Sequence, residues 1–121
     1  MKDLLQTFIE VPAFTKQWAD LGLDDDDLFE LQKILIKDPE AGDLIQQTGG
    51  LRKLRFAIEG RGKRSGARVC YVEFYAYETI YLITAYAKNE KVNLTDAEKN
   101  KLRNLVKRLK DECSKKYKGD K

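Results

Sequence analysis

The sequence predicts a small α+β domain in which an antiparallel sheet packs against helices, in the order β-α-α-β-β-β-α. Three observations support this fold class. The chain has 121 residues, of which 42% are hydrophobic and 36% are charged, which suits a single globular domain. Three runs rich in β-forming residues follow one another in the middle of the chain. Apolar residues with helical spacing flank these runs on both sides.

The N-terminal part predicts one strand and then a short helix. Leu4–Val11 is rich in β-forming residues, and Pro12 suits the first position of a following helix. Gly22 can end this helix, because glycine readily adopts the left-handed conformation that follows a helix. The apolar face of the helix repeats every three or four residues, at Phe14, Trp18 and Leu21.

A second helix is predicted to begin at the acidic run Asp24–Asp27. Aspartate side chains accept hydrogen bonds from the free N–H groups of a helix start and suit its positive dipole end. Asp38-Pro39 ends the helix. The four aspartates have no spacing that would bring ligands to one point, so we do not expect a metal site there. The buried face is predicted to be Leu28, Leu31, Ile34 and Leu35.

The rest of the chain predicts the sheet and a final helix. Residues 40–50 are rich in turn residues and are expected to form a loop. The strands expected after it form an antiparallel meander with helices on one face, and they are Leu51–Ile58, Arg68–Tyr75 and Thr79–Ala87. Thr95 and Glu98 form a capping box ahead of the last helix, whose apolar stripe is Leu102, Leu105, Val106 and Leu109. We expect one domain over residues 1–113 and a frayed polar tail over 114–121.

Positive charge is concentrated at mid-chain. The segment Arg52–Arg68 contains seven lysines or arginines and one acid, a local charge of +6, whereas residues 1–51 carry −7 and residues 69–121 carry +4. The whole chain therefore has a net charge of only +3. Clustered cations interleaved with glycine are typical of a site that binds a polyanion.

Composition excludes several kinds of chemistry. The chain has no histidine, which rules out catalytic triads and pairs that need one. Gly60–Gly66 joins two strands and opens no helix, so dinucleotide binding is not expected. Cys70 and Cys113 are too far apart for a metal motif and are expected to be buried free thiols in a reducing cytoplasm. We expect no cofactor and no metal. We also expect no membrane association, because no apolar run approaches the ~20 residues that span a bilayer.

Strand alternation divides the basic segment into parts. Lys53 and Arg55 share one face of their strand, and Leu54 and Phe56 take the other. If the strands pair as a meander, the cationic pair can converge with residues of the next two strands. The predicted group is Lys53, Arg55, Arg68, Tyr86 and Lys88, with Arg61, Lys63 and Arg64 at its edge.

Such a surface can bind nucleic acid and can also cleave RNA. Phosphates bind through charge and counterion release, and aromatic rings stack unpaired bases. Cleavage by the 2′-hydroxyl needs a base, an acid and a group that stabilises charge on the phosphorane oxygens. Arginine supplies the last of these, and a lysine crowded by other cations can serve as acid or base. A module that binds nucleic acid without cutting it, or that docks an acidic protein, would present the same surface.

Four segments in order resemble the HigB branch of the RelE-like toxins. They are Ala41-Gly42-Asp43-Leu44-Ile45, Thr48-Gly49-Gly50-Leu51-Arg52-Lys53-Leu54-Arg55, Gly60-x-Gly62-Lys63-Arg64-x-Gly66-x-Arg68-Val69 and Tyr81-Leu82-x-x-x-Tyr86-x-Lys88-Asn89-Glu90. The resemblance covers roughly residues 4–110. It implies a RelE-like microbial RNase fold and the toxin of a type II toxin–antitoxin module, a metal-independent endoribonuclease that cuts mRNA in the A site of the 70S ribosome. It also implies a cognate antitoxin, expected to carry a helix-turn-helix DNA-binding domain.

The resemblance assigns roles to several residues. Arg68 matches the arginine that stabilises the scissile phosphate, and Lys88 matches a basic position at the end of the last strand. Lys53 and Arg55 match the basic strand, although a slip of one residue would select Arg52, which we otherwise expect to bind RNA or the ribosome together with the basic turn. RelE itself also uses a C-terminal tyrosine, which Leu94–Asn100 lacks. The proton donor is therefore either Tyr86 or a lysine.

Overall fold

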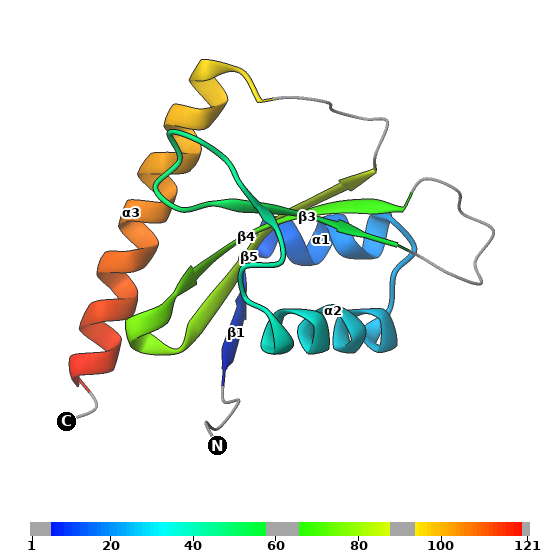
Figure 1. The fold of residues 1–121 in the computed structure, drawn as a ribbon, viewed down its shortest axis with the longest axis horizontal. Helices are drawn as coiled ribbons and strands as arrows, with labels where there is room; N and C mark the ends of the chain where they lie inside the picture. Colours follow the sequence, from blue (N-terminus) through cyan, green and yellow to red (C-terminus); the bar gives the residue numbers. More distant parts are fainter. Residues whose placement is uncertain (1–5, 58–65, 88–93, 120–121) are drawn as a thin grey trace.

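The computed structural model describes residues 6–57, 66–87 and 94–119. Within them lie the three helices and the run of strands that the sequence predicts (Figure 1). The elements are β1 (Thr7–Glu10), α1 (Pro12–Asp20), α2 (Asp25–Lys37), β2 (Asp43–Leu44), β3 (Arg52–Phe56), β4 (Ala67–Phe74), a 3-10 turn (Tyr75–Tyr77), β5 (Thr79–Ala87) and α3 (Asp96–Gly119). The predicted α+β fold class is confirmed.

The strands form one sheet in the order β1-β5-β4-β3-β2. The predicted meander of β3, β4 and β5 is antiparallel throughout. Two features differ from the expectation. β1 lies parallel to β5, so the sheet is mixed, and β2 adds a two-residue edge strand within the segment expected to be a loop. The expected strand residues Leu4 and Leu5 lie outside the described residues.

Helices cover both faces of the sheet, so the expectation of one covered face is wrong (Figure 1). On one face, α1 and α2 pack against β3, β4 and β5 through a cluster that includes Phe14, Trp18, Leu31, Leu35, Leu54, Phe56, Val69, Tyr71 and Leu82. On the other face, α3 packs through Leu51, Cys70, Val72, Phe74, Tyr81, Ile83, Val106, Leu109 and Cys113. Burial of β4 and β5 on both sides explains their near-continuous apolar runs.

The predicted helix boundaries are largely confirmed. Pro12 opens α1, and Gly22, with φ of 81°, follows its end. Asp24 caps α2, which ends before Asp38. α3 continues to Gly119, and so includes most of the polar segment expected to be a tail. No helix among the described residues is long and apolar enough to cross a membrane.

The segment between β2 and β3 lies against α3 (Figure 1). The hydroxyl of Thr48, fully buried, donates to the Ile45 carbonyl at 2.6 Å and accepts from the Leu51 N–H at 3.1 Å. Gly49 has a positive φ, and a Cβ at this position would lie 3.5 Å from Val106 of α3. The Thr-Gly-Gly-Leu sequence therefore forms a tight turn that packs against α3 and leads directly into β3.

Candidate active site

Three of the predicted site residues lie in one row across the sheet. Arg55 of β3 pairs with Arg68 of β4, and Arg68 pairs with Tyr86 of β5. Lys53 lies two positions from Arg55 on the same strand and pairs with Cys70. Because residues two apart on a strand point to the same face, Lys53 and Arg55 share the face opposite the buried Leu54 and Phe56. The register thus brings together Lys53, Arg55, Arg68 and Tyr86, and we call this group the cationic face.

The cationic face is the part of the α3 side of the sheet that α3 leaves uncovered. Apolar residues of β4 from Cys70 to Phe74 pack under the helix, whereas Lys53 and Arg68 are half-buried and Arg55 is exposed. Tyr86 lies at the boundary, partly buried against the same cluster. This face of the sheet therefore has an apolar part that packs against α3 and a cationic part that α3 does not cover.

The charges of the cationic face are not neutralised by the protein groups described. Among residues 6–57, 66–87 and 94–119, the ion pairs do not involve Lys53, Arg55 or Arg68. The Arg68 Nη1 is buried and has no hydrogen-bond partner there. Like charges opposite one another on neighbouring strands destabilise a sheet, and a buried donor without an acceptor costs free energy. An anion bound at this row would relieve both costs.

Tyr86 is held at the edge of the row by Cys70. The pKa of the Tyr86 phenol is raised to about 12, mainly by burial and also by the nearby Cys70, while Arg68 lowers it. The interaction between the two side chains raises the pKa of the phenol and lowers the pKa of the Cys70 thiol. Burial also raises the pKa of Cys70 to about 11, although Lys53 opposes this. At neutral pH both groups therefore keep their protons.

Cys70 is the residue of this site that the sequence did not reveal. Its apolar surroundings predicted a buried free thiol, which is confirmed. Its contact with Tyr86 depends on the register of β4 with β5, which shifts between Cys70 and Tyr71. A β-bulge is not visible in a strand pattern of alternating residues. Sequence alone therefore could not connect these two side chains.

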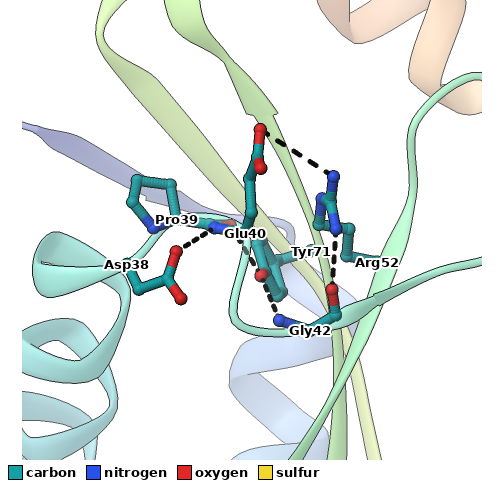
Figure 2. Close-up of polar contacts among 6 residues, drawn as sticks. All are labelled: Asp38, Pro39, Glu40, Gly42, Arg52 and Tyr71. Atoms are coloured by element: carbon teal, nitrogen blue, oxygen red, sulfur yellow. Dashed lines mark hydrogen bonds and ion pairs between the residues drawn. The ribbon is translucent and has the colours of Figure 1, made fainter.

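Arg52 precedes Lys53 on β3, so its side chain lies on the opposite face of the sheet from the cationic face. It takes part in a different cluster (Figure 2). Its Nη1 donates to the Gly42 carbonyl at 2.8 Å, and its Nη2 lies 4.0 Å from the Glu40 carboxylate. The Tyr71 hydroxyl donates to the Pro39 carbonyl at 2.7 Å and accepts from the Gly42 N–H at 2.9 Å. Arg52 thus ties β3 to the segment that leads from α2 into β2.

The remaining predicted residues lie outside the part of the chain that the structure describes. These are Lys88 and the basic turn residues Arg61, Lys63 and Arg64. Both of their segments begin at strand ends next to the row, since β3 ends at Phe56 and β5 ends at Ala87. In the described ranges, no three histidine, cysteine or acidic side chains are grouped so that they could hold a metal ion.

The arrangement is suited to an RNA phosphate. Two guanidinium groups side by side can bind phosphate oxygens through charge-assisted hydrogen bonds, and a protonated phenol lies in the same row.

Comparison with known protein families agrees with this chemistry. The family model described as the RelE toxin of the RelE/RelB toxin–antitoxin system matches residues 12–118. Proteins of this family are toxins of type II toxin–antitoxin modules and are generally endoribonucleases that cleave mRNA. Because this family model matches nearly the whole length of the chain, the chain belongs to the RelE toxin family.

Proposed function

We propose that this protein is a ribosome-dependent endoribonuclease that cuts mRNA in the ribosomal A site and so inhibits translation. The observation that carries the proposal is the row of Arg55, Arg68 and Tyr86 on the open end of the sheet, with Lys53 beside it. Membership of the RelE family supports it. We further propose that the chain belongs to the HigB branch, on the four ordered motifs of its sequence, and that it acts in the cytoplasm.

The proposed reaction uses the RNA's own 2′-hydroxyl as nucleophile. The 2′-oxygen bonds to the adjacent phosphorus and gives its proton to a base, while the bond from phosphorus to the 5′-oxygen breaks. An acid supplies the proton that the departing 5′-oxygen takes up. The products are a 2′,3′-cyclic phosphate and a 5′-hydroxyl. No redox partner is needed, and we propose that no metal takes part.

Arginine side chains stabilise the charge in this scheme. As the 2′-oxygen attacks, negative charge grows on the non-bridging phosphate oxygens, and fixed donors aimed at them lower the barrier. We assign this role to Arg68, whose buried Nη1 lacks an acceptor among the described residues. Arg55, its direct neighbour on β3, holds the same phosphate in place.

The proton transfers fall to Tyr86 and to lysine. Because its pKa is raised to about 12, the Tyr86 phenol is protonated at neutral pH and is suited to the acid role rather than the base role. We assign the base role to Lys53, and Lys88 is the second lysine proposed for the reaction. Binding of the RNA and the ribosome is proposed for the basic turn (Arg61, Lys63 and Arg64) and for Arg52.

The family also implies a protein partner. RelE toxins act together with an antitoxin, and we propose that the antitoxin of this chain carries a helix-turn-helix DNA-binding domain. A short reading frame next to this gene that encodes such a protein would support the pairing.

The test is cleavage of mRNA by the purified protein with and without programmed ribosomes. We expect cleavage in the A-site codon only when ribosomes are present, with a 2′,3′-cyclic phosphate on the upstream fragment. Tyr86→Phe removes the proposed acid and should slow single-turnover cleavage by about 100-fold or more. Tyr75→Phe, which changes an exposed tyrosine, is the matched control and should leave the rate unchanged.

Each other outcome points to a different account. If the protein binds ribosomes tightly and salt-sensitively but the mRNA stays intact, it is a non-catalytic binding module. If Tyr86→Phe cleaves at the wild-type rate while Lys88→Gln does not, the acid is a lysine.

A further inference from the structure

A cavity of about 380 Å³ borders the cationic face. It lies between the β2–β3 edge of the sheet and the N-terminal part of α3, and Lys53 belongs to both the cavity and the cationic face. The cavity is lined by Asp43, Leu44, Ile45, Lys53, Leu94 and Lys99. A second cavity of about 460 Å³ shares Lys99 and continues along α3. The first cavity therefore extends from Lys53, at the proposed phosphate site, to Lys99 in the first turn of α3.

The lining combines apolar surface with one acid and two lysines. Leu44, Ile45 and Leu94 supply the apolar part. Asp43 is paired directly with Lys53 across β2 and β3, so both side chains leave the sheet on the same face. An exposed carboxylate repels the phosphate backbone, whereas an apolar wall and polar edge groups suit a flat, uncharged ring. The chemistry of the cavity therefore fits a nucleobase better than it fits a phosphate.

The position of Asp43 favours some bases over others. A carboxylate only accepts hydrogen bonds, and lysine only donates them. Adenine, cytosine and guanine each carry an amino group that can donate to a carboxylate, and single-stranded RNA is read on such edges. Uracil presents carbonyl oxygens on both sides of its single ring N–H. A carboxylate next to uracil therefore meets at least one oxygen that it repels.

We propose that this cavity binds the base of a nucleotide next to the scissile phosphate, and that Asp43 selects bases carrying an amino group over uracil. Lys99 donates to the ring nitrogen or carbonyl of the same base, and the apolar wall covers its face. This proposal rests on the proposed function and adds the part of the site that discriminates between codons.

The experiment measures single-turnover cleavage of a set of mRNAs on programmed ribosomes, varied one base at a time on each side of the cut. At one position, wild-type protein should cleave the uracil substrate about 5- to 100-fold more slowly than the others. Asp43→Asn should abolish this difference, because an amide both donates and accepts. Asp43→Glu keeps the carboxylate and should keep the base order. Asp26→Asn, an exposed change on α2, is the matched control and should retain wild-type ratios.

A second variant tests the same cavity without changing β2, in case a substitution at Asp43 lowers activity by disturbing that strand. Lys99→Gln leaves the strand unchanged and should slow cleavage of every substrate while keeping the base order, because every base offers an acceptor to the lysine. Unchanged base ratios in Asp43→Asn, or a wild-type rate in Lys99→Gln, overturn the proposal while leaving the endonuclease intact. Failure of the wild-type protein to cleave any of the mRNAs would instead overturn the proposed function.

Discussion

At the scale of single residues, Tyr71 shows how a side chain on the opposite face of the sheet can position the strands of the site. It lies on β4 but on the face opposite the cationic face, in the cluster packed by α1 and α2. Its hydroxyl joins Pro39 and Gly42, and Gly42 in turn accepts from Arg52 on β3 (Figure 2). The contact is close, since a Cβ on Gly42 would lie 2.9 Å from the Lys53 carbonyl oxygen. Through these bonds β2 is positioned beside β3.

We predict that Tyr71→Phe destabilises the protein by about 1–3 kcal/mol, because it leaves the buried Gly42 N–H and the Pro39 carbonyl without their partner. Tyr75→Phe is the matched control; this side chain is 70% exposed, and we expect the free energy of unfolding to stay within about 0.5 kcal/mol of the wild type. Urea denaturation of both variants measures the difference. Equal stability of the two variants would show that the Tyr71 hydroxyl does not hold this segment.

At the scale of secondary-structure elements, the acidic run at the start of α2 has a structural role. The Asp24 carboxylate accepts from the Asp27 N–H at 3.0 Å, and the Asp27 carboxylate accepts from the Asp24 N–H at 2.9 Å. This reciprocal pair satisfies two of the donors that a helix start leaves free. The cap could be predicted from sequence because it depends only on residues three positions apart.

We predict that Asp24→Ala lowers the free energy of unfolding by about 1 kcal/mol, the usual cost of losing an N-cap. Asp26→Ala removes a charge from the same turn but no capping bond, so its cost should be a few tenths of a kcal/mol. The comparison is made by thermal or urea unfolding at low salt. A larger loss for Asp26→Ala than for Asp24→Ala would contradict the capping role.

Other features of the elements depend on distant residues, which is why the sequence did not reveal them. The apolar stripe of α3 predicts a buried helix face, but not which side of the sheet it covers. The continuous apolar run from Val69 to Val72 was the available sign that β4 is buried on both sides. The two residues of β2 are too few to show a pattern, and the parallel pairing of β1 depends on β5, about 70 residues later.

The candidate site was predicted to the extent that local alternation defines it. The alternation of Leu54 and Phe56 with Lys53 and Arg55 correctly predicted which side chains of β3 share a face. It could not place Arg52, whose partner is a carbonyl ten residues earlier. Nor could it reveal the cavity at Asp43, because that surface exists only where β2, β3 and the start of α3 come together.

At the scale of the whole molecule, opposite charges lie on different parts of the fold. Residues 1–51, which include α1 and α2, carry a charge of −7. The cationic face lies on the other side of the sheet, which α1 and α2 do not cover. A molecule with separated charge turns its positive side toward a polyanion before contact is made. The arrangement of the fold therefore serves approach to RNA as well as binding.

The central claim is that the row of Arg55, Arg68 and Tyr86 is the site of RNA cleavage, and Arg68→Ala tests it most directly. The measurement is the single-turnover rate of mRNA cleavage on programmed ribosomes, with folding checked by circular dichroism. Loss of the charge-stabilising group should lower the rate by about 10²- to 10³-fold. Arg108→Ala, which removes an exposed arginine from α3, should change it far less. A folded Arg68→Ala protein that cleaves at the wild-type rate would contradict the account.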